Sequence, residues 1–512
     1  MKNNSLGQQF SQQSLSRGAR TVCSLSVLGV LLSACVVGPN FKTPLAPLNA
    51  DQAAYGAPLA GTVAAPGAAG VAQTLVSGQD IPSAWWQVFH SPALDSLIRT
   101  ALEKSPNLAA AQAALRQAQE NYTAQAGSVL YPAVSGSLGA NRQQQAAVAT
   151  SGVHVPAYDL YNASVSVSYA VDLFGGNQRG LEALRAGVDY QRFQVEAAYL
   201  SLTANLVTSA IREASLRAQL QATEQIIASQ NSQLEVLEKQ FKIGAIAKAS
   251  LLAQRNLLAQ TRAGVPALQK SLEQTRNQLA VYAGKLPGEA DLPHFELESL
   301  QLPATLPLTV PSTLLRQRPD IRASESLLQQ ASAQVGVATA AQYPQLNLTA
   351  NYGYSGTDSG KLFSSNGNLW SIGAGLTAPL FNGGALSAKR RAAEAAYDQV
   401  AAQYRNTVLM AFQNVADSLR ALDYDAQTLK QQAEVEALAK ETLDLTTKQY
   451  QLGSVSSLAL LDAKRSYQSA RIALVQAQAS RYADTAALFQ ALGGGWWNRS
   501  ELADISRTAA SQ

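Results

Sequence analysis

The fold is decided by a stretch that occurs twice, as QFKIGAIAKASLL at residues 240–252 and as QYQLGSVSSLALL at residues 449–461. In both copies a single glycine, Gly244 or Gly453, follows a long run of helix-forming residues, and a pair of leucines comes soon after it. A glycine at such a place can end a helix in the left-handed conformation and let the chain reverse. The stretch therefore predicts two helical hairpins that are separated by 209 residues.

Other motifs recur in the same order, which indicates a tandem duplication. Tyr131-Pro132 opens a strand-like stretch in the first copy, and Tyr343-Pro344 does so in the second. The sequence DLFGG at 172–176 returns loosely as PLFNGG at 379–384. From these matches we assign four parts: a first structural repeat at 85–283, a Pro-rich join at 284–311, a second repeat at 312–492 and a C-terminal tail at 493–512.

Most of each repeat has the pattern of long helices. Apolar residues keep a seven-residue spacing from Leu251 to Leu279, and again from Tyr199 to Phe241 with one gap. Sustained heptads predict coiled-coil packing. Residues 385–450 contain neither Pro nor Gly, and a helix of that length would reach about 100 Å. Pro266 lies inside a heptad run, and we expect a kink or a local break there.

Each repeat also contains two segments in which apolar and polar residues alternate. They predict strands near residues 131–146, 158–173, 343–357 and 368–381. A soluble, half-buried sheet gives the same period of two. We favour strands that span a membrane, because the residues off the apolar face are small or uncharged and the lengths suit a tilted spanning strand. Four strands cannot close a barrel in lipid, so several chains must pool theirs.

The N-terminus has the features of a lipoprotein signal peptide, which we assign to residues 1–34. A basic stretch and an apolar segment lead to Leu32-Ser33-Ala34-Cys35, which matches a lipobox. The alternative is a chance cysteine after an apolar run. We expect Cys35 to carry an N-acyl and an S-diacylglycerol group, because two chains or more give a stable anchor. Val36 in place of Asp favours the outer membrane, by resemblance to bacterial lipoproteins. Residues 35–84, rich in Ala, Gly and Pro, predict a lipid-anchored extended tether.

Composition and motifs exclude several classes of function. Most of the net charge of +4 comes from the basic leader, so nucleic acid is not an expected partner. The histidines His90, His154 and His294 are far apart, and no phosphate-binding loop or nucleophile elbow is present. We therefore expect no enzymatic activity, no metal site and no cofactor other than the covalent lipid.

Three motifs together resemble one known family. They are CVVGPNF at 35–41, the run from Trp86 to Ile98 with Phe89, Pro92 and Leu94, and RPDIR at 318–322. These residues, with the paired turns, resemble the lipoprotein branch of the TolC-type outer-membrane factors, from the lipobox to about Leu492. The resemblance implies a trimer with a mixed fold. Four strands per chain are pooled into one twelve-stranded membrane β-barrel, and long helices form a coiled-coil α-helical barrel through the periplasm. It also implies a mixed equatorial layer.

The resemblance implies a passive exit channel of a tripartite efflux system in the outer membrane, extending into the periplasm. The implied partners are a periplasmic adaptor protein and an inner-membrane pump of the RND type, besides the other two subunits of a homotrimer and outer-membrane lipid. Two alternatives remain open from the sequence: an exit duct for type I protein secretion, and a structural lipoprotein that spaces two layers of the envelope.

The resemblance also suggests roles for the paired turns and for a short stretch after the second one. Gly244 and Gly453 would lie in the periplasmic tip that contacts the adaptor; the simpler interpretation is two plain helical turns. Asp462 would belong to a carboxylate ring at the closed end of the tunnel, with Leu458 one helical turn earlier as an apolar gate ring. The alternative for Asp462 is a solvated helix face.

Two further assignments complete the candidate residues. Tyr450 matches a residue that ties neighbouring helices together, but Ser250 stands where the family has the acidic partner of that tyrosine. Arg318-Pro319-Asp320 predicts a helix start, with Pro in the first turn and Asp near the positive end of the helix dipole. We favour a structural role for it.

Overall fold

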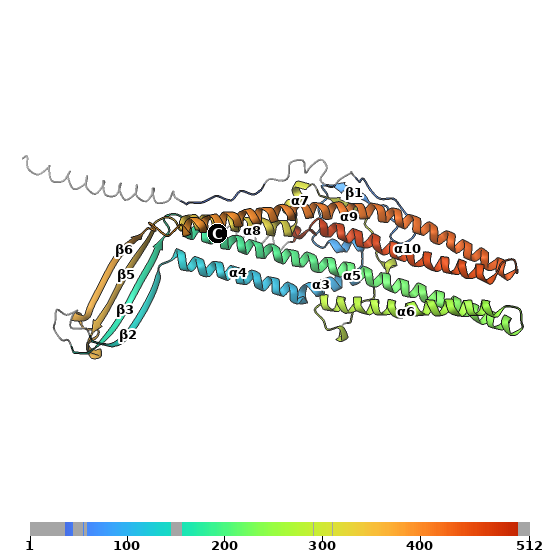
Figure 1. The fold of residues 1–512 in the computed structure, drawn as a ribbon, viewed down its shortest axis with the longest axis horizontal. Coiled ribbons are helices and arrows are strands. Elements are labelled where there is room, and N and C mark those ends of the chain that lie inside the picture. Colours follow the sequence, from blue (N-terminus) through green and yellow to red (C-terminus); the bar gives the residue numbers. More distant parts are fainter. Residues whose placement is uncertain are drawn as a thin grey trace, which may run out of the picture. The chain divides into compact units, whose positions relative to one another are not determined.

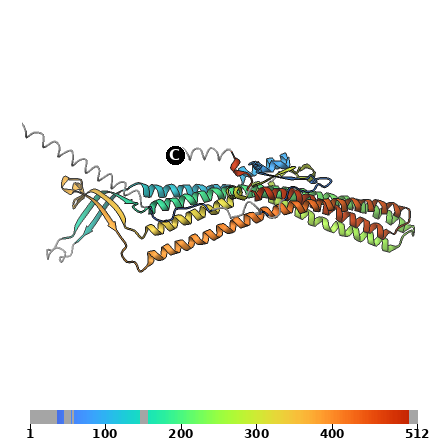
Figure 2. The same ribbon diagram turned by 90° about the horizontal axis from the view of Figure 1, so that it is seen from above.

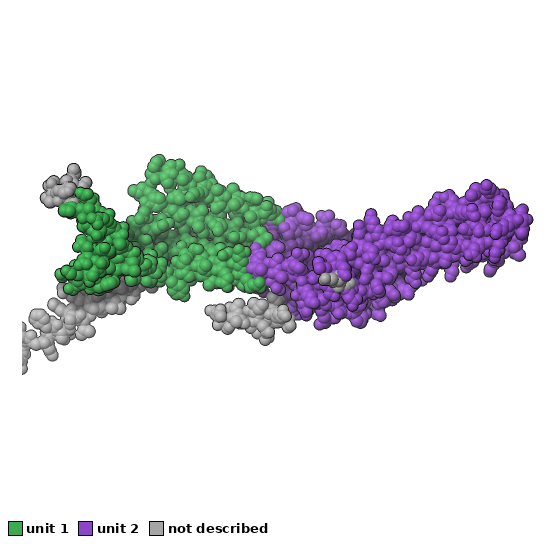
Figure 3. All heavy atoms as spheres, turned by 90° about the horizontal axis from the view of Figure 1, so that it is seen from below, with its two compact units in different colours: residues 1–43, 116–190, 325–403 green, residues 44–115, 191–324, 404–512 purple. Residues whose placement is uncertain are grey.

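The computed structural model describes most of the chain beyond the leader. The described ranges are residues 36–44, 55, 59–144, 156–289, 291–309 and 311–499. The predicted signal peptide, Cys35, His154 and the tail from residue 500 lie outside them. The chain divides into two compact units, coloured separately in Figure 3: residues 1–43, 116–190 and 325–403, and residues 44–115, 191–324 and 404–512.

The first unit contains a four-stranded antiparallel sheet in the order β2-β3-β5-β6 (Figure 1). The strands are β2 (Ala133–Gln143), β3 (Tyr158–Val171), β5 (Gln345–Gly356) and β6 (Asn368–Thr377). Each lies within one of the four segments where alternation predicts a strand. Their lengths of 10 to 14 residues match or slightly exceed the 9 to 11 or so that a tilted spanning strand needs.

The register of the sheet brings the apolar residues onto one face. Val167 of β3 pairs with Ala350 of β5, which pairs with Ile372 of β6. The neighbouring row consists of Ser166, Asn351 and Ser371, on the opposite face because side chains alternate along a strand. Apolar side chains of the two outer strands are exposed in the single chain: Val134, Leu138, Trp370, Ile372 and Leu376 are 65 to 83% exposed. A sheet with such a face needs an apolar environment.

The long helices repeat with a constant offset. Helix α5 (Gly176–Lys242) and helix α9 (Ala385–Gln451) each have 67 residues. Helix α6 (Lys248–Tyr282) and helix α10 (Ser457–Ala491) each have 35 residues. Helix α9 begins and ends 209 positions after α5, and α10 begins and ends 209 positions after α6. Figures 1 and 2 show the α5–α6 and α9–α10 hairpins running side by side at their turn ends.

The heptad residues of α6 form its inner face. Leu251, Leu258, Leu272 and Leu279 are buried, as coiled-coil packing requires. Of the kink or local break expected at Pro266, the break is wrong, because α6 continues through this residue as one helix. Pro266 lies on the exposed side, so the carbonyl of Arg262, which loses its helical donor, faces solvent and keeps access to water.

Other helices and short segments complete the two units. They are η1 (Trp85–Phe89), α3 (Pro92–Lys104), α4 (Pro106–Leu130), η3 (Pro287–Glu289), η4 (Leu297–Ser299), α7 (Pro311–Gln317), α8 (Pro319–Ala340), η5 (Ser359–Lys361), η6 (Ser365–Gly367) and η7 (Trp496–Asn498). Trp85 and Phe89 are fully buried, and Trp85 stacks on Phe489 of α10 with ring centroids 5.5 Å apart.

The tether assigned to residues 35–84 is not a free linker along its whole length. Strand β1 (Thr74–Ser77) pairs in parallel with β4 (Thr305–Leu308) of the join. The Gln73 side chain is fully buried and donates to the Thr485 hydroxyl of α10 at 3.2 Å. Arg481 of α10 donates to Thr62 and to the Val71 carbonyl, both at 3.3 Å. Small residues allow this segment to lie close to α10, and the buried amide nitrogen of Gln73 finds an acceptor there.

The start of the tail is also packed in the second unit. Trp496 donates to the Gln317 carbonyl at 2.6 Å. Trp497 and Asn498 donate to the two carboxylate oxygens of Asp80 at 3.1 and 2.8 Å. Residues 496–499 of the tail are therefore packed against the rest of the second unit, and Arg499 pairs with Glu196.

Candidate functional site

The two glycine turns have the same backbone geometry. Gly244 has φ +74° and Gly453 has φ +75°. At the first turn the amide of Ala245 donates to the Gln240 carbonyl at 2.9 Å, and at the second the amide of Ser454 donates to the Gln449 carbonyl at 2.9 Å. Bonds of this span, with the glycine left-handed, form the Schellman motif that ends a helix. The predicted helix ends are confirmed, whereas contact with an adaptor stays a prediction.

The two hairpins are joined near their turns by hydrogen bonds between the repeats. The Tyr450 hydroxyl, at the end of α9, donates to the Gln240 side chain of α5 at 3.3 Å. The Ser457 hydroxyl, at the start of α10, donates to that of Ser250 in α6 at 3.0 Å. Ser250 thus bonds to the second hairpin through Ser457. Burial raises the pKa of Tyr450 above the usual value, so its hydroxyl remains a donor at neutral pH.

Asp462 and Leu458, which are proposed to form a gate, lie on the exposed face of α10 in the single chain. The Asp462 side chain is 65% exposed and Leu458 is 60% exposed. Their neighbours Leu460, Leu461 and Ala463 are buried within the protomer. The nearest ionic partner of Asp462 is Arg465, one turn further, with Nη1 3.9 Å from Oδ1. This arrangement leaves Asp462 and Leu458 available to face other copies of the chain.

Arg318-Pro319-Asp320 has the structural role that the sequence predicts. Pro319 and Asp320 begin α8. The Arg318 guanidinium donates to both oxygens of the Asp320 carboxylate, at 3.0 and 2.7 Å, and to the carbonyl of Ala491 at 2.9 Å. Ala491 is the last residue of α10, where a cation favours the negative end of the helix dipole. The motif therefore joins two helices.

A buried charge cluster was missed by reasoning from the sequence. Glu213 of α5 is fully buried and accepts hydrogen bonds from Arg217 and from Arg276 of α6, the latter at 3.1 Å. Its other oxygen accepts from the backbone amide of Phe295 in the join at 3.0 Å. Position 213 is the single gap in the heptad run from Tyr199 to Phe241, and that gap was the only signal of the cluster.

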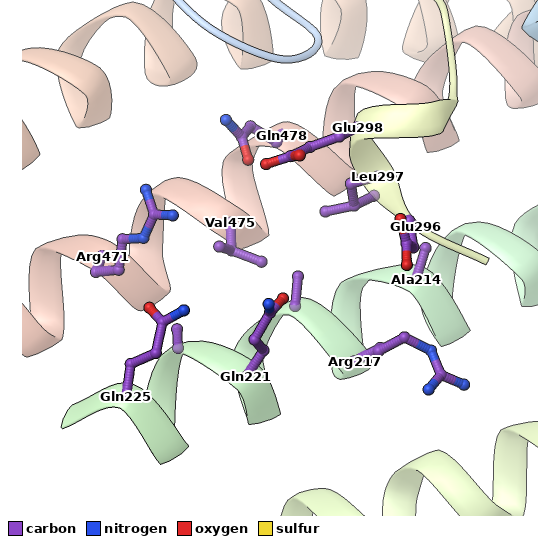
Figure 4. A pocket seen from close by; sticks show the side chains of 12 residues that line it. Ala214, Arg217, Gln221, Gln225, Glu296, Leu297, Glu298, Arg471, Val475 and Gln478 are labelled. Atoms are coloured by element: carbon purple, nitrogen blue, oxygen red, sulfur yellow. The ribbon is translucent and has the colours of Figure 1, made fainter. Parts of the chain in front are cut away.

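A small cavity of about 260 Å³ lies between α5, α10 and the join. Figure 4 shows Gln221 and Gln225 of α5 on one side and Val475 and Arg471 of α10 on the other. The lining is largely polar and carries both charge signs, with Glu298 of the join near Gln478. Such a lining suits a hydrated space between helices and lacks the apolar walls typical of a small-molecule binding site.

Two features are absent from the described residues. No group of three or more His, Cys, Asp or Glu side chains is placed to hold a metal ion there. Within the same part of the chain, every helix is too short or too polar to cross a bilayer.

A sheet with an exposed apolar face, joined to long helical hairpins, defines a channel-forming protein of the bacterial outer membrane. The family model described as outer membrane efflux protein matches residues 97–285 and 310–494. The chain belongs to the outer membrane efflux protein family. Members of this family are efflux channels and not enzymes.

Individual relatives agree with this assignment over nearly the whole chain. The pyoverdine export outer membrane protein OpmQ of Pseudomonas aeruginosa is 34% identical over 424 residues, which are 80% of this chain and 87% of that protein. The probable efflux pump outer membrane protein TtgC of Pseudomonas putida is 29% identical over 494 residues, 95% of this chain and 98% of that protein.

Solved structures show the same fold. The outer-membrane channel OprN superposes with a TM-score of 0.81 at 27% identity, covering 90% of this chain and all of that one. The outer membrane protein VceC of Vibrio cholerae superposes with a TM-score of 0.75 at 27% identity, covering 81% of this chain and all of that one. The protein is thus an outer-membrane component of an efflux system.

Proposed function

We propose that three copies of the chain form a passive exit duct that conducts small molecules across the outer membrane. The observation that carries the proposal is the sheet. Strands β2 and β6 are its edges, each with one neighbour among the described residues, and both expose apolar side chains. Open edges in lipid leave backbone groups without partners. Pairing β6 of one copy with β2 of the next removes every edge and yields twelve strands.

The helical hairpins would form the periplasmic tunnel and its closed end. In a threefold arrangement the exposed face of α10 would turn towards the symmetry axis. Asp462 and Leu458 of the three copies would then surround this axis. A ring of carboxylates favours cations, and an apolar ring beside it narrows the passage. The turns at Gly244 and Gly453 would meet the periplasmic adaptor, because they present the free ends of both hairpins. The Tyr450–Gln240 and Ser457–Ser250 bonds hold these ends together.

The names of the relatives support the proposed cargo and partners. Proteins similar to this chain are named for export of pyoverdine and for efflux of toluene. Both names refer to small molecules, which favours efflux over protein secretion for this chain as well. We infer that an inner-membrane pump of the RND type and its adaptor supply the energy, and that the duct itself catalyses no reaction. A lipid on Cys35 would anchor the chain.

The test is planar-bilayer conductance of the purified protein, together with the mass of the oligomer. We expect a trimer with a small, cation-selective conductance that rises in Asp462→Ala. Glu441→Ala is the matched control, because Glu441 is an exposed acid on α9 outside the proposed ring. A monomeric protein, or a trimer that conducts equally before and after Asp462→Ala, would overturn the proposed duct or its gate.

A further inference from the structure

Residues 36–41, which directly follow Cys35, are held against the first unit by four residues. We call these four, Gly175, Arg179, Glu182 and Gly336, the N-terminal cradle. Arg179 and Glu182 lie on α5, Gly175 lies just before it, and Gly336 lies on α8. All belong to the first compact unit.

Arg179 makes the polar contacts of the cradle. Its side chain is only 6% exposed. Nε donates to the Val37 carbonyl at 3.3 Å, and Nη2 donates to the Gly38 carbonyl at 3.4 Å and to the Asn40 side chain at 2.6 Å. Nη1 donates to Glu182 at 2.7 Å, which fixes the plane of the guanidinium. A buried arginine with this many partners is pre-organised for one geometry.

The glycines let the backbones touch. Gly38 has φ +93°, and a Cβ atom there would lie 2.5 Å from the Gly336 Cα. A Cβ atom at Gly336 would lie 2.8 Å from the Arg179 Cγ. On the other side, Gly175 has φ +75°, and a Cβ atom there would lie 2.7 Å from Val36 Cγ1. Only glycine fits at these three positions, because the close contacts leave no space for a side chain.

The cradle lies where the strands end. The amide of Val37 donates to the Phe174 carbonyl at 3.1 Å, and Phe174 comes three residues after β3 ends at Val171. The Phe174 ring stacks on Tyr343, which precedes β5, with centroids 4.7 Å apart. Aromatic residues at strand ends form the girdles that mark the membrane interface of outer-membrane barrels. The segment after Cys35 is therefore pinned at that level.

We propose that the N-terminal cradle is a binding site for the chain's own residues 36–41, and that it fixes the point at which the lipid anchor enters the membrane. The inference rests on the lipidation of Cys35 included in the proposed function. Residues 36–41 would then form a fixed attachment beside β3 and β5 and not a loose tether. Insertion of the lipid and insertion of the strands are then coupled, since one cannot move far without the other.

The test is hydrogen exchange of the full-length, lipidated protein, read on a peptide that covers residues 36–44. We compare Gly38→Ala, which brings a Cβ atom against Gly336, with Asn40→Ala, which removes only the 2.6 Å bond to Arg179. The control is Gly180→Ala, because Gly180 neighbours Arg179 on α5 and a Cβ atom there meets nothing within 4 Å.

We expect exchange in the peptide to accelerate by about tenfold in Asn40→Ala, the factor that corresponds to losing one hydrogen bond to a charged group. Exchange should accelerate at least as much in Gly38→Ala, where the added Cβ atom clashes with the Gly336 backbone, and stay unchanged in the control. Asn40 is exposed, so its replacement leaves the rest of the unit folded. The yield of membrane-inserted trimer should fall severalfold in Gly38→Ala. Wild-type exchange as fast as that of an unfolded peptide, or equal exchange in all variants, would overturn the cradle.

Two further readouts separate this inference from the proposed function. Labelling of the same proteins with radioactive palmitate reports lipidation of Cys35, and bilayer conductance reports the duct. Slow exchange in a protein that takes up no palmitate would keep the cradle as a binding site and overturn its role in placing a lipid. A lipidated protein that conducts but exchanges freely at residues 36–44 would refute the cradle and leave the duct standing.

Discussion

Arg276 of α6 donates a hydrogen bond of 3.1 Å to the fully buried carboxylate of Glu213 in α5. Glu213 occupies a core position of the heptad run and is fully buried. A buried carboxylate is tolerated only when it is paired and hydrogen-bonded. Here it accepts from two arginines and from the Phe295 amide, so one side chain fixes α5, α6 and the join together.

Glu213→Ala should destabilise the protein by about 3 kcal/mol, the scale of breaking a buried ion pair. The two arginines and the Phe295 amide would lose their acceptor, although the arginine side chains keep some access to water. Chemical denaturation of the detergent-solubilised protein measures the effect. Glu224→Ala is the control, since Glu224 is exposed on the same helix. Equal midpoints for the two variants would contradict the role of the cluster.

Gly244→Ala and Gly453→Ala should each destabilise the hairpin by about 1 to 2 kcal/mol, because an L-residue is strained in the left-handed conformation. Space is not the cause, since a Cβ atom at either glycine meets nothing within 4 Å. Gly264→Ala is the matched control inside α6, where the same exchange should stabilise the helix by about 0.5 to 1 kcal/mol. Thermal unfolding of the three variants distinguishes a backbone requirement from a general effect of added methyl groups.

Much of the fold could be predicted because local patterns determine it. The glycine turns, the heptads and the alternation in β5 and β6 each depend on neighbours within a few residues. The packing of residues 59–84 could not be predicted in this way. Gln73 finds its partner Thr485 at a separation of 412 residues, and a segment rich in Ala and Gly does not indicate which surface it contacts.

The candidate site could be predicted from the sequence only in part. The sequence locates the turns, and the structure gives them the expected geometry. The interruption of the heptads at Glu213 was visible, but its partners lie on another helix and in the join. Asp462 and Leu458 depend on contacts between copies of the chain, which neither the sequence nor one protomer contains. Their roles as gate residues therefore stay predictions.

The stability of the protein should fall as pH rises from about 4 towards 8 because of one carboxyl group. Burial, the hydrogen bond with Asp425 and the charge of Asp425 raise the pKa of Asp484 to about 8, against the lowering effect of Arg481. A group with a raised folded-state pKa stabilises the protein fully below its unfolded-state pKa, near 4, and this stabilisation is lost as pH rises through the folded-state value.

Asp484→Asn tests this carboxyl group, because an amide resembles the protonated acid. We expect the wild type to lose at least about 1 kcal/mol of stability between pH 5 and 8 and the variant to lose less. Glu441→Gln provides the comparison for an exposed acid. Parallel pH profiles for the wild type and Asp484→Asn would show that burial and Asp425 do not raise the pKa of Asp484.

The exposed pair of Asp462 and Arg465, 3.9 Å apart, should control ion selectivity while contributing little to stability, because solvent screens such pairs. In a trimer each substitution acts three times at the constriction. Arg465→Gln removes three positive charges beside the carboxylate ring and should raise the preference for cations, whereas Asp462→Asn should lower it. Reversal potentials across a bilayer with a salt gradient measure both shifts. Opposite shifts with unchanged unfolding temperatures would support a charged constriction at this turn of α10; wild-type reversal potentials in both variants would mean that neither side chain faces the path of the ions.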